Sequence, residues 1–145
     1  MSYSGTPSVE LGLFKFAFTG NLSTNDYLNI TSEDNNITGS SITGSNTLNL
    51  PAGAYLLKCF VGADRTNSSD VLEFQIESDG SLVDVIGSHL STNVVNSKYE
   101  TTSDHAYAQI LKTTSHSIKV KVTNCTSSAW TVNSNFSYFL IIRSF

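Results

Sequence analysis

Serine, aspartate and histidine stand side by side at one point of the sequence, Ser103-Asp104-His105. These are the residue types of a catalytic triad, in which a histidine takes the proton of a serine hydroxyl and a carboxylate orients the histidine. Neighbouring residues of a strand point to opposite faces, and the chain has no Gly-x-Ser-x-Gly turn to expose a nucleophile. We therefore expect no enzyme and no catalytic residue here.

Metal sites are the second kind of chemistry to consider. The three histidines stand far apart, at His89, His105 and His116. They have no metal-ligand spacing, and we expect each at a strand edge or in a loop, exposed to solvent. The segment SEDNN (32–36) and the pair Asp64 and Asp70 could bind calcium, but neither follows the Asp-x-Asp-x-Asp-Gly pattern. We expect solvated acidic turns, with no metal and no cofactor.

Tryptophan and cysteine are rare in this chain, and each has few possible roles. Trp130, the only tryptophan, could stack on a sugar or could equally be a buried anchor of its loop. Cys59 lies within an apolar run and Cys125 in a polar turn. Two cysteines make neither a disulfide framework nor a metal site, so we expect two reduced thiols, made in a host cytoplasm.

The composition narrows the class of protein. The 145 residues suit one domain, and the net charge of −4 with scattered basic residues argues against nucleic-acid binding. No apolar run approaches a membrane span, and we expect neither a membrane segment nor a secretory signal. Ser, Thr and Asn make up 52 residues, which gives a polar, nearly uncharged surface of the kind found on extracellular β-proteins and virion proteins.

The secondary structure that positions these side chains is predicted from short apolar runs, which are separated by turn residues. The spacing predicts eight or nine strands in one β-sandwich or barrel, because no segment has helical periodicity. Asp79-Gly80 between two alternating runs predicts a hairpin. The polar tract 32–46 holds at most one weak strand. The expected strands lie at 9–18, 27–31, 47–50, 54–63, 71–78, 81–88, 106–111, 116–123 and 137–143.

Three of these strands are apolar on both faces. In the last one, Phe136, Tyr138, Leu140 and Ile142 alternate with a second apolar set, and the runs 54–61 and 106–111 are similar. A strand with one wet face would alternate apolar with polar residues. If the three strands share a sheet, its outer side is an apolar patch, which monomers rarely leave exposed.

A repeated subunit is the simplest cover for such a patch, although long polar loops of the same chain could also cover it. We expect a homotrimer, with Phe60, Tyr107, Tyr138 and Leu140 at the contact and Lys58 and Gln109 as its polar members. The expected subunit interface is Leu56, Lys58, Phe60, Tyr107, Gln109, Tyr138 and Leu140.

Four segments give this chain a family resemblance. The segments resemble the TNF/C1q-like jelly-roll family. LPAGAYLLKCF (50–60) is similar to a strand of that family that begins with Gly-x-Tyr, and LEFQIESDGSLVDVIG (72–87) is similar to its central hairpin. AYAQILKTTSHSIKVKV (106–122) resembles a pair of strands of that family, and FSYFLII (136–142) its C-terminal signature. Tyr138 departs from the pattern, because C1q-type domains usually have Gly there.

The resemblance implies an all-β antiparallel sandwich, a jelly roll, that trimerises through the sheet holding the C-terminal strand. Acidic, Ser/Thr/Asn-rich jelly-roll trimers of this size look like virion proteins of tailed bacteriophages. The leading expectation is a head decoration or cement protein, whose partner is the major capsid protein on the capsid exterior. The alternatives are a receptor- or glycan-binding fibre tip, and a secreted C1q/TNF-like ligand. The absence of a stalk favours the first.

Residues 1–8 precede the first strand, and residues 9–145 are expected to form the single jelly-roll domain. The first eight residues are uncharged, with one aromatic residue, Tyr3, and one proline, Pro7. Ordering each residue of such a segment costs about 1–2 kcal/mol, which its small apolar area does not offset. We expect this arm to bind an external partner or to pack on a sibling subunit. On a capsid, Tyr3 and Pro7 would contact the shell.

Overall fold

The computed structural model describes residues 9–65, 71–82, 89–91, 100–112, 114–125 and 130–144. The regular secondary structure of these residues is strand apart from one short 3-10 helix, and no helix in them is long and apolar enough to span a membrane. The elements are β1 (Val9–Ala17), β2 (Asn29–Asn35), β3 (Ser41–Thr43), β4 (Thr47–Leu50), β5 (Gly53–Arg65), β6 (Val71–Ser78), β7 (Ser81–Leu82), β8 (His89–Ser91), β9 (Glu100–Lys112), β10 (His116–Cys125), β11 (Thr131–Val132), the short 3-10 helix η1 (Ser134–Phe136) and β12 (Tyr138–Ser144).

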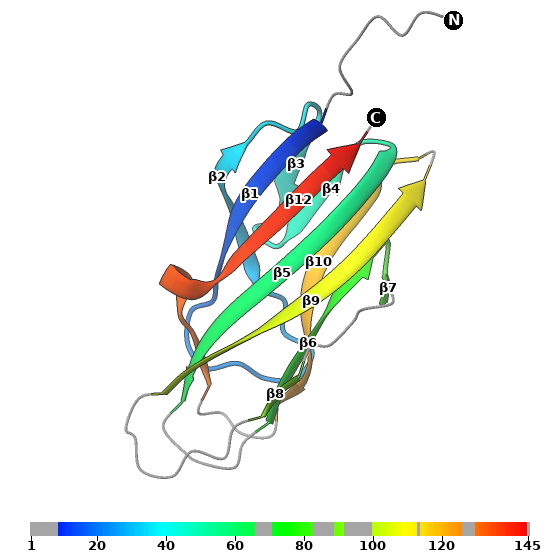
Figure 1. Ribbon diagram of the computed structural model, residues 1–145. Coiled ribbons are helices and arrows are strands. Elements are labelled where there is room, and N and C mark those ends of the chain that lie inside the picture. The colour runs from blue at the N-terminus through cyan, green and yellow to red at the C-terminus, as the bar shows by residue number, and fades with distance from the viewer. Residues whose placement is uncertain are drawn as a thin grey trace, which may run out of the picture.

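The strands form two antiparallel six-stranded sheets that lie face to face (Figure 1). Sheet A has the order β9-β5-β12-β1-β2, with β11 continuing the β12 side of β5. Sheet B has the order β3-β4-β10-β6, and β7 and β8 pair with opposite ends of β6. The start of β1 and the end of β12 lie side by side, because Val9 pairs with Ser144.

One apolar core fills the space between the sheets. Every second residue of β10 is buried from His116 through Val122, and buried residues alternate in the same way along β1 and between Tyr55 and Val61 of β5. Burying each of these side chains contributes about 1.5–3 kcal/mol. The largest fully buried side chains are Trp130, Tyr55, Phe14, Phe16, Phe74 and Phe139.

The predicted fold class is confirmed, and the described residues hold eight strands of four or more residues. Asp79 and Gly80 both have positive φ, 52° and 83°, and Ser78 pairs with Ser81 across them. This is the geometry of a two-residue type I′ hairpin, in which glycine has no Cβ to strain. The partner strand was expected at 81–88, of which residues 83–88 lie outside the described part.

The polar tracts hold more strand than predicted. β2 extends to Asn35, through a tract expected to be mostly loop, and β3 follows it. β9 begins at Glu100 instead of residue 106, because its polar first half pairs with Val61–Arg65 of β5. Backbone pairing with an established neighbour stabilises these segments where their side chains give no apolar pattern.

Candidate interaction face

The outer face of sheet A is the side of β1, β12 and β5 that points away from the core. On β12, Phe139 and Ile141 are buried, and the residues between them point outward. The strand pattern on β1 and β5 is the same. The face comprises Val9, Leu11, Leu13, Lys15, Leu56, Lys58, Phe60, Tyr138, Leu140 and Ile142.

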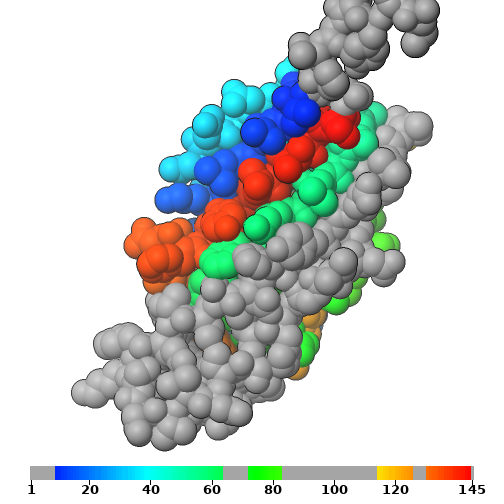
Figure 2. Space-filling view, in the orientation of Figure 1, coloured from blue at the N-terminus to red at the C-terminus, as the bar shows by residue number. Residues whose placement is uncertain are grey.

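The register joins these residues into rows across the sheet. Tyr138 pairs with Phe60, and their rings stack with centroids 5.1 Å apart and planes 12° from parallel. In the next row, Leu140 lies between Leu13 of β1 and Lys58 of β5. Figure 2 shows the atoms of β1, β12 and β5 side by side on this surface. The face is therefore a continuous apolar surface with lysines set into it.

A pocket opens where β1 and β12 meet η1. Its volume is about 310 Å³, and its lining comes from Leu13, Lys15, Asn135, Ser137 and Tyr138. The Lys15 ammonium lies 4.0 Å from a Glu33 carboxylate oxygen, at the β2 side of the face. The pocket is thus lined by apolar groups together with the side chain of Lys15.

The backbone at this end of β12 is fixed by Ser137. Its buried hydroxyl accepts a hydrogen bond from the Gly62 N–H at 2.9 Å and donates to the Asn133 carbonyl at 2.8 Å. A Cβ on Gly62 would lie 2.7 Å from the Phe136 Cβ, so only glycine allows this close approach. These contacts set where Tyr138 begins the strand.

The outer face of sheet B is different in kind. Glu73, Gln75, Lys119 and Lys121 stand in the half-buried positions of β6 and β10. Tyr27 donates a hydrogen bond to Glu77 at 2.9 Å, and that contact raises the pKa of the Tyr27 hydroxyl. The Lys119 ammonium lies 4.8 Å from the centre of the Tyr27 ring. The described polar groups at the middle of this face thus contact one another.

Five of the residues predicted for an interface lie together on the outer face of sheet A: Leu56, Lys58, Phe60, Tyr138 and Leu140. The backbone register places Tyr107 opposite Lys58 and Gln109 opposite Leu56, so β9 extends the same rows. The three two-faced strands share one sheet, with β5 between β9 and β12. Tyr3 and Pro7 lie outside the described residues. The role of this set as a subunit interface stays a prediction.

Two details of the expected face were wrong or incomplete. Phe136 was placed on the last strand, but it lies in η1 and is 55% exposed, because β12 begins only at Tyr138. Leu11 and Leu13 of β1 were not expected on the face. The sequence held the evidence for them, because both the odd-numbered and the even-numbered residues of 9–18 are mostly apolar, as in the other two-faced strands.

The histidines were expected at strand edges or in loops, exposed to solvent. His89 begins β8, as expected of a strand edge, but His116 and His105 differ from the prediction. His116 opens β10 and is 1% exposed, with its ring edge-on to Tyr55 at 5.6 Å and its Nδ1 4.0 Å from an Asp79 carboxylate oxygen. It takes an inward position of the strand, where the apolar body of an imidazole packs well. Ser103, Asp104 and His105 all lie on β9, so His105 is within a strand, opposite Phe60.

The acidic segment at 32–36 is also not a turn. Its residues Ser32 to Asn35 belong to β2, where Glu33 and Asp34 are exposed. Asp64 lies on β5, and Asp70 is outside the described residues. Within the described part of the chain, no three His, Cys, Asp or Glu side chains come together as a metal site.

Trp130 is fully buried, which removes it as a platform for sugar stacking and leaves the anchor reading. Its carbonyl accepts a hydrogen bond from the Leu22 N–H at 2.9 Å. Neither Cys59, which is buried, nor Cys125, which is half-buried, forms a disulfide in the structure. Burial raises the pKa of the Cys59 thiol well above its ordinary value, which keeps it protonated.

Comparisons with known proteins place the fold. No family model matches the chain, and no curated protein sequence matches it. Among solved structures, murine APRIL at pH 5.0 is similar with a TM-score of 0.56 and 11% identity, over 92% of this chain and 98% of that one. Eiger TNF from S. frugiperda is similar with a TM-score of 0.52 and 10% identity, over 94% and 92%. The chain is a TNF-like jelly roll.

Proposed function

We propose that this protein is a homotrimeric structural protein of a virion, which decorates the outer surface of a capsid and stabilises contacts between capsomers. The observation that carries the self-association is the contrast between the two sheets. The outer face of sheet A exposes Leu11 and Leu56 to 49% and 46%. On sheet B the outer positions of β6 and β10 hold hydrogen-bonded and charged groups, and Leu82 of the short strand β7 is an exposed apolar residue beside them. A large apolar face of this kind marks an interaction site.

The virion role rests on composition and fold. A polar, weakly charged surface rich in Ser, Thr and Asn suits a protein exposed on a particle, and a jelly roll is a compact unit for repeated assembly. A decoration protein acts by linkage: a ligand that binds only the assembled shell stabilises that shell by mass action. The burial of Trp130 removes one residue that would favour a glycan-binding fibre tip.

The first experiment measures mass. Light scattering coupled to size exclusion at micromolar concentration should give about three times the 15.7 kDa of the chain. A mass of one chain would contradict self-association in solution.

The second experiment tests the location. Purified protein added to particles that lack it should bind the heads, as counted by gel densitometry and immunogold imaging. Binding only at tails would overturn the decoration role and favour a receptor-binding fibre tip. Absence of binding to any part of the particle would contradict both virion roles.

A further inference from the structure

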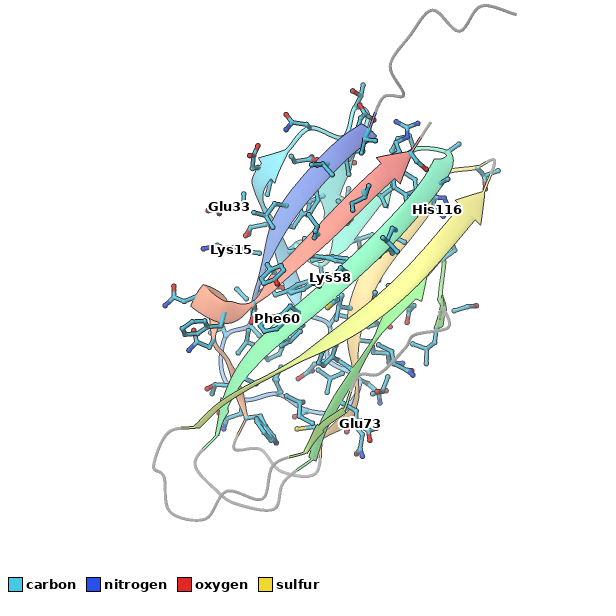
Figure 3. All side chains as sticks on the ribbon, in the orientation of Figure 1. Lys15, Glu33, Lys58, Phe60, Glu73 and His116 are labelled. Atoms are coloured by element: carbon cyan, nitrogen blue, oxygen red, sulfur yellow. The ribbon has the colours of Figure 1, made fainter. Side chains whose placement is uncertain are left out.

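The charges on the outer face of sheet A are separated across the sheet. Lys58 lies on β5, near the β9 side, whereas Glu33 and Asp34 are exposed on β2 at the opposite side. Figure 3 shows Lys15 and Glu33 together at one side of the sheet and Lys58 over the middle of it. Glu33 is the acid near Lys15, at 4.0 Å, and Asp34 makes no ion pair with any described residue. One side of the face thus carries a carboxylate available for a partner.

Asp34 and Lys58 occupy the same row across the strands. Asp34 pairs with Leu13, Leu13 with Leu140, and Leu140 with Lys58. Three strand spacings of about 4.8 Å separate the two backbones, so they lie about 14 Å apart within one chain. That separation exceeds the Debye length of about 8 Å in physiological salt, so the two charges barely interact within a subunit.

Symmetry brings opposite sides of such a face together. In a closed ring of identical copies, each contact joins one side of the face to the opposite side of the next copy. The face is longest along its strands: the seven residues of β12 span about 23 Å at about 3.3 Å per residue. A ring whose axis follows the strands therefore buries the longest sides, with β2 of one copy against the β5–β9 side of its neighbour.

We infer that Asp34 of one copy forms an ion pair with Lys58 of the next copy around the ring. Rotation about an axis parallel to the strands leaves each residue's position along that axis unchanged. Residues of one row therefore lie at the same position along the axis in every copy. The apolar row between them, Leu13 and Leu140, packs against the same row of the neighbours. This inference rests on the proposed self-association, and it adds the partner surface and the direction of each contact.

A double charge reversal tests the pair. Asp34→Lys alone and Lys58→Asp alone each place like charges at every contact, and each should raise the dissociation constant of the oligomer about tenfold or more. The double variant restores opposite charges at every contact. Its dissociation constant should return to within about threefold of the wild type. Analytical ultracentrifugation over a dilution series measures all four proteins.

The control is Glu73→Lys, a charge reversal on the outer face of sheet B, which should leave the dissociation constant unchanged. Circular dichroism melts verify that each variant is folded. An oligomeric wild type whose double variant stays as weak as the single ones would overturn the ion pair and leave self-association standing. A monomeric wild type would overturn both. Rescue in the double variant can come only from contacts between copies, because the two positions are too far apart within one chain.

Discussion

At the scale of single residues, the aromatic pair Tyr138 and Phe60 is the most specific feature of the outer face of sheet A. The two rings stack in parallel at 5.1 Å, on neighbouring strands, with the pocket beside Tyr138. Tyrosine at an interface adds apolar area with little loss of side-chain entropy, so it is a common anchor of protein contacts.

Tyr138→Asp should weaken assembly by placing a carboxylate in this apolar surface. Loss of a buried aromatic anchor costs about 2 kcal/mol or more, or roughly 30-fold in the dissociation constant. Sedimentation of the purified variant across a concentration series measures the shift. Glu73→Asp, on the outer face of sheet B, is the matched control and should change nothing. An unchanged oligomer in Tyr138→Asp would show that copies meet through another surface.

Residue environments were the least predictable part of the molecule. The sequence around His116 resembles a polar strand edge, but only the register of β10 reveals that this residue occupies an inward position. Trp130 was equally consistent with exposure and burial until its place beside the core was known. Side chains with both an apolar body and a polar tip suit either environment, so their type alone does not decide.

At the scale of elements, an ion pair fastens the first strand to the last at one end of sheet A. Arg143 donates a hydrogen bond to Glu10 at 2.9 Å and another to the Ala52 carbonyl at 2.8 Å. Glu10 also accepts from the Thr38 hydroxyl and N–H. These contacts join β1, β12 and the connections before β3 and β5, and they lower the pKa of Glu10, with the Thr38 hydroxyl as the largest cause.

The lowered pKa of Glu10 predicts acid sensitivity. The unfolded chain binds this proton more readily than the folded one, so the carboxylate's contribution is full above the ordinary value near 4.5 and is lost as pH falls through the lower folded value. Melting temperature should therefore fall on acidification through that range, and Glu10→Gln should flatten the fall. Thr38→Val keeps the carboxylate but removes its main donor, so it should reduce the slope in part. An unaltered pH profile in Glu10→Gln would contradict this role.

Most strands were predictable because alternation and turn chemistry agree. The Asp79-Gly80 hairpin follows from two residues that tolerate positive φ between two alternating runs. The failures are the second half of β2, after residue 31, and the first half of β9, whose side chains are polar. Their strand structure comes from hydrogen bonds to β1 and β5, which no local pattern shows.

At the scale of the whole molecule, the difference between the two sheets was accessible from sequence. Strands apolar at both parities mark sheet A, and alternating strands such as β6 and β10 mark sheet B. The sequence also shows that residues 9–18 are apolar on both faces, but only the pairing of β1 with β12 shows that Leu11 and Leu13 face outward. The charge separation between β2 and β5 likewise depends on strand order, which links residues far apart in the chain.

A prediction about the N-terminal arm distinguishes self-association of the chain from binding of the oligomer to the particle. Residues 1–8 precede β1, which starts beside the last residues of β12, and they lie outside the described part of the chain. Under the decoration proposal, the arm binds the shell, through Tyr3 and Pro7, while the outer face of sheet A holds the trimer together. Deleting residues 2–8 should therefore leave the oligomer's mass and melting temperature unchanged and reduce its occupancy on particle heads.

The two readouts must be taken on the same preparation. Light scattering reports the trimer, and gel densitometry with immunogold imaging reports how much truncated protein binds particles that lack the native one. Tyr3→Ala with Pro7→Ala in the full-length chain is the matched variant, because it keeps the arm's length while removing its aromatic ring and its rigid φ. Full head occupancy by both variants would remove the arm from the mechanism. Loss of the trimer on deletion would instead assign the arm to contacts between subunits.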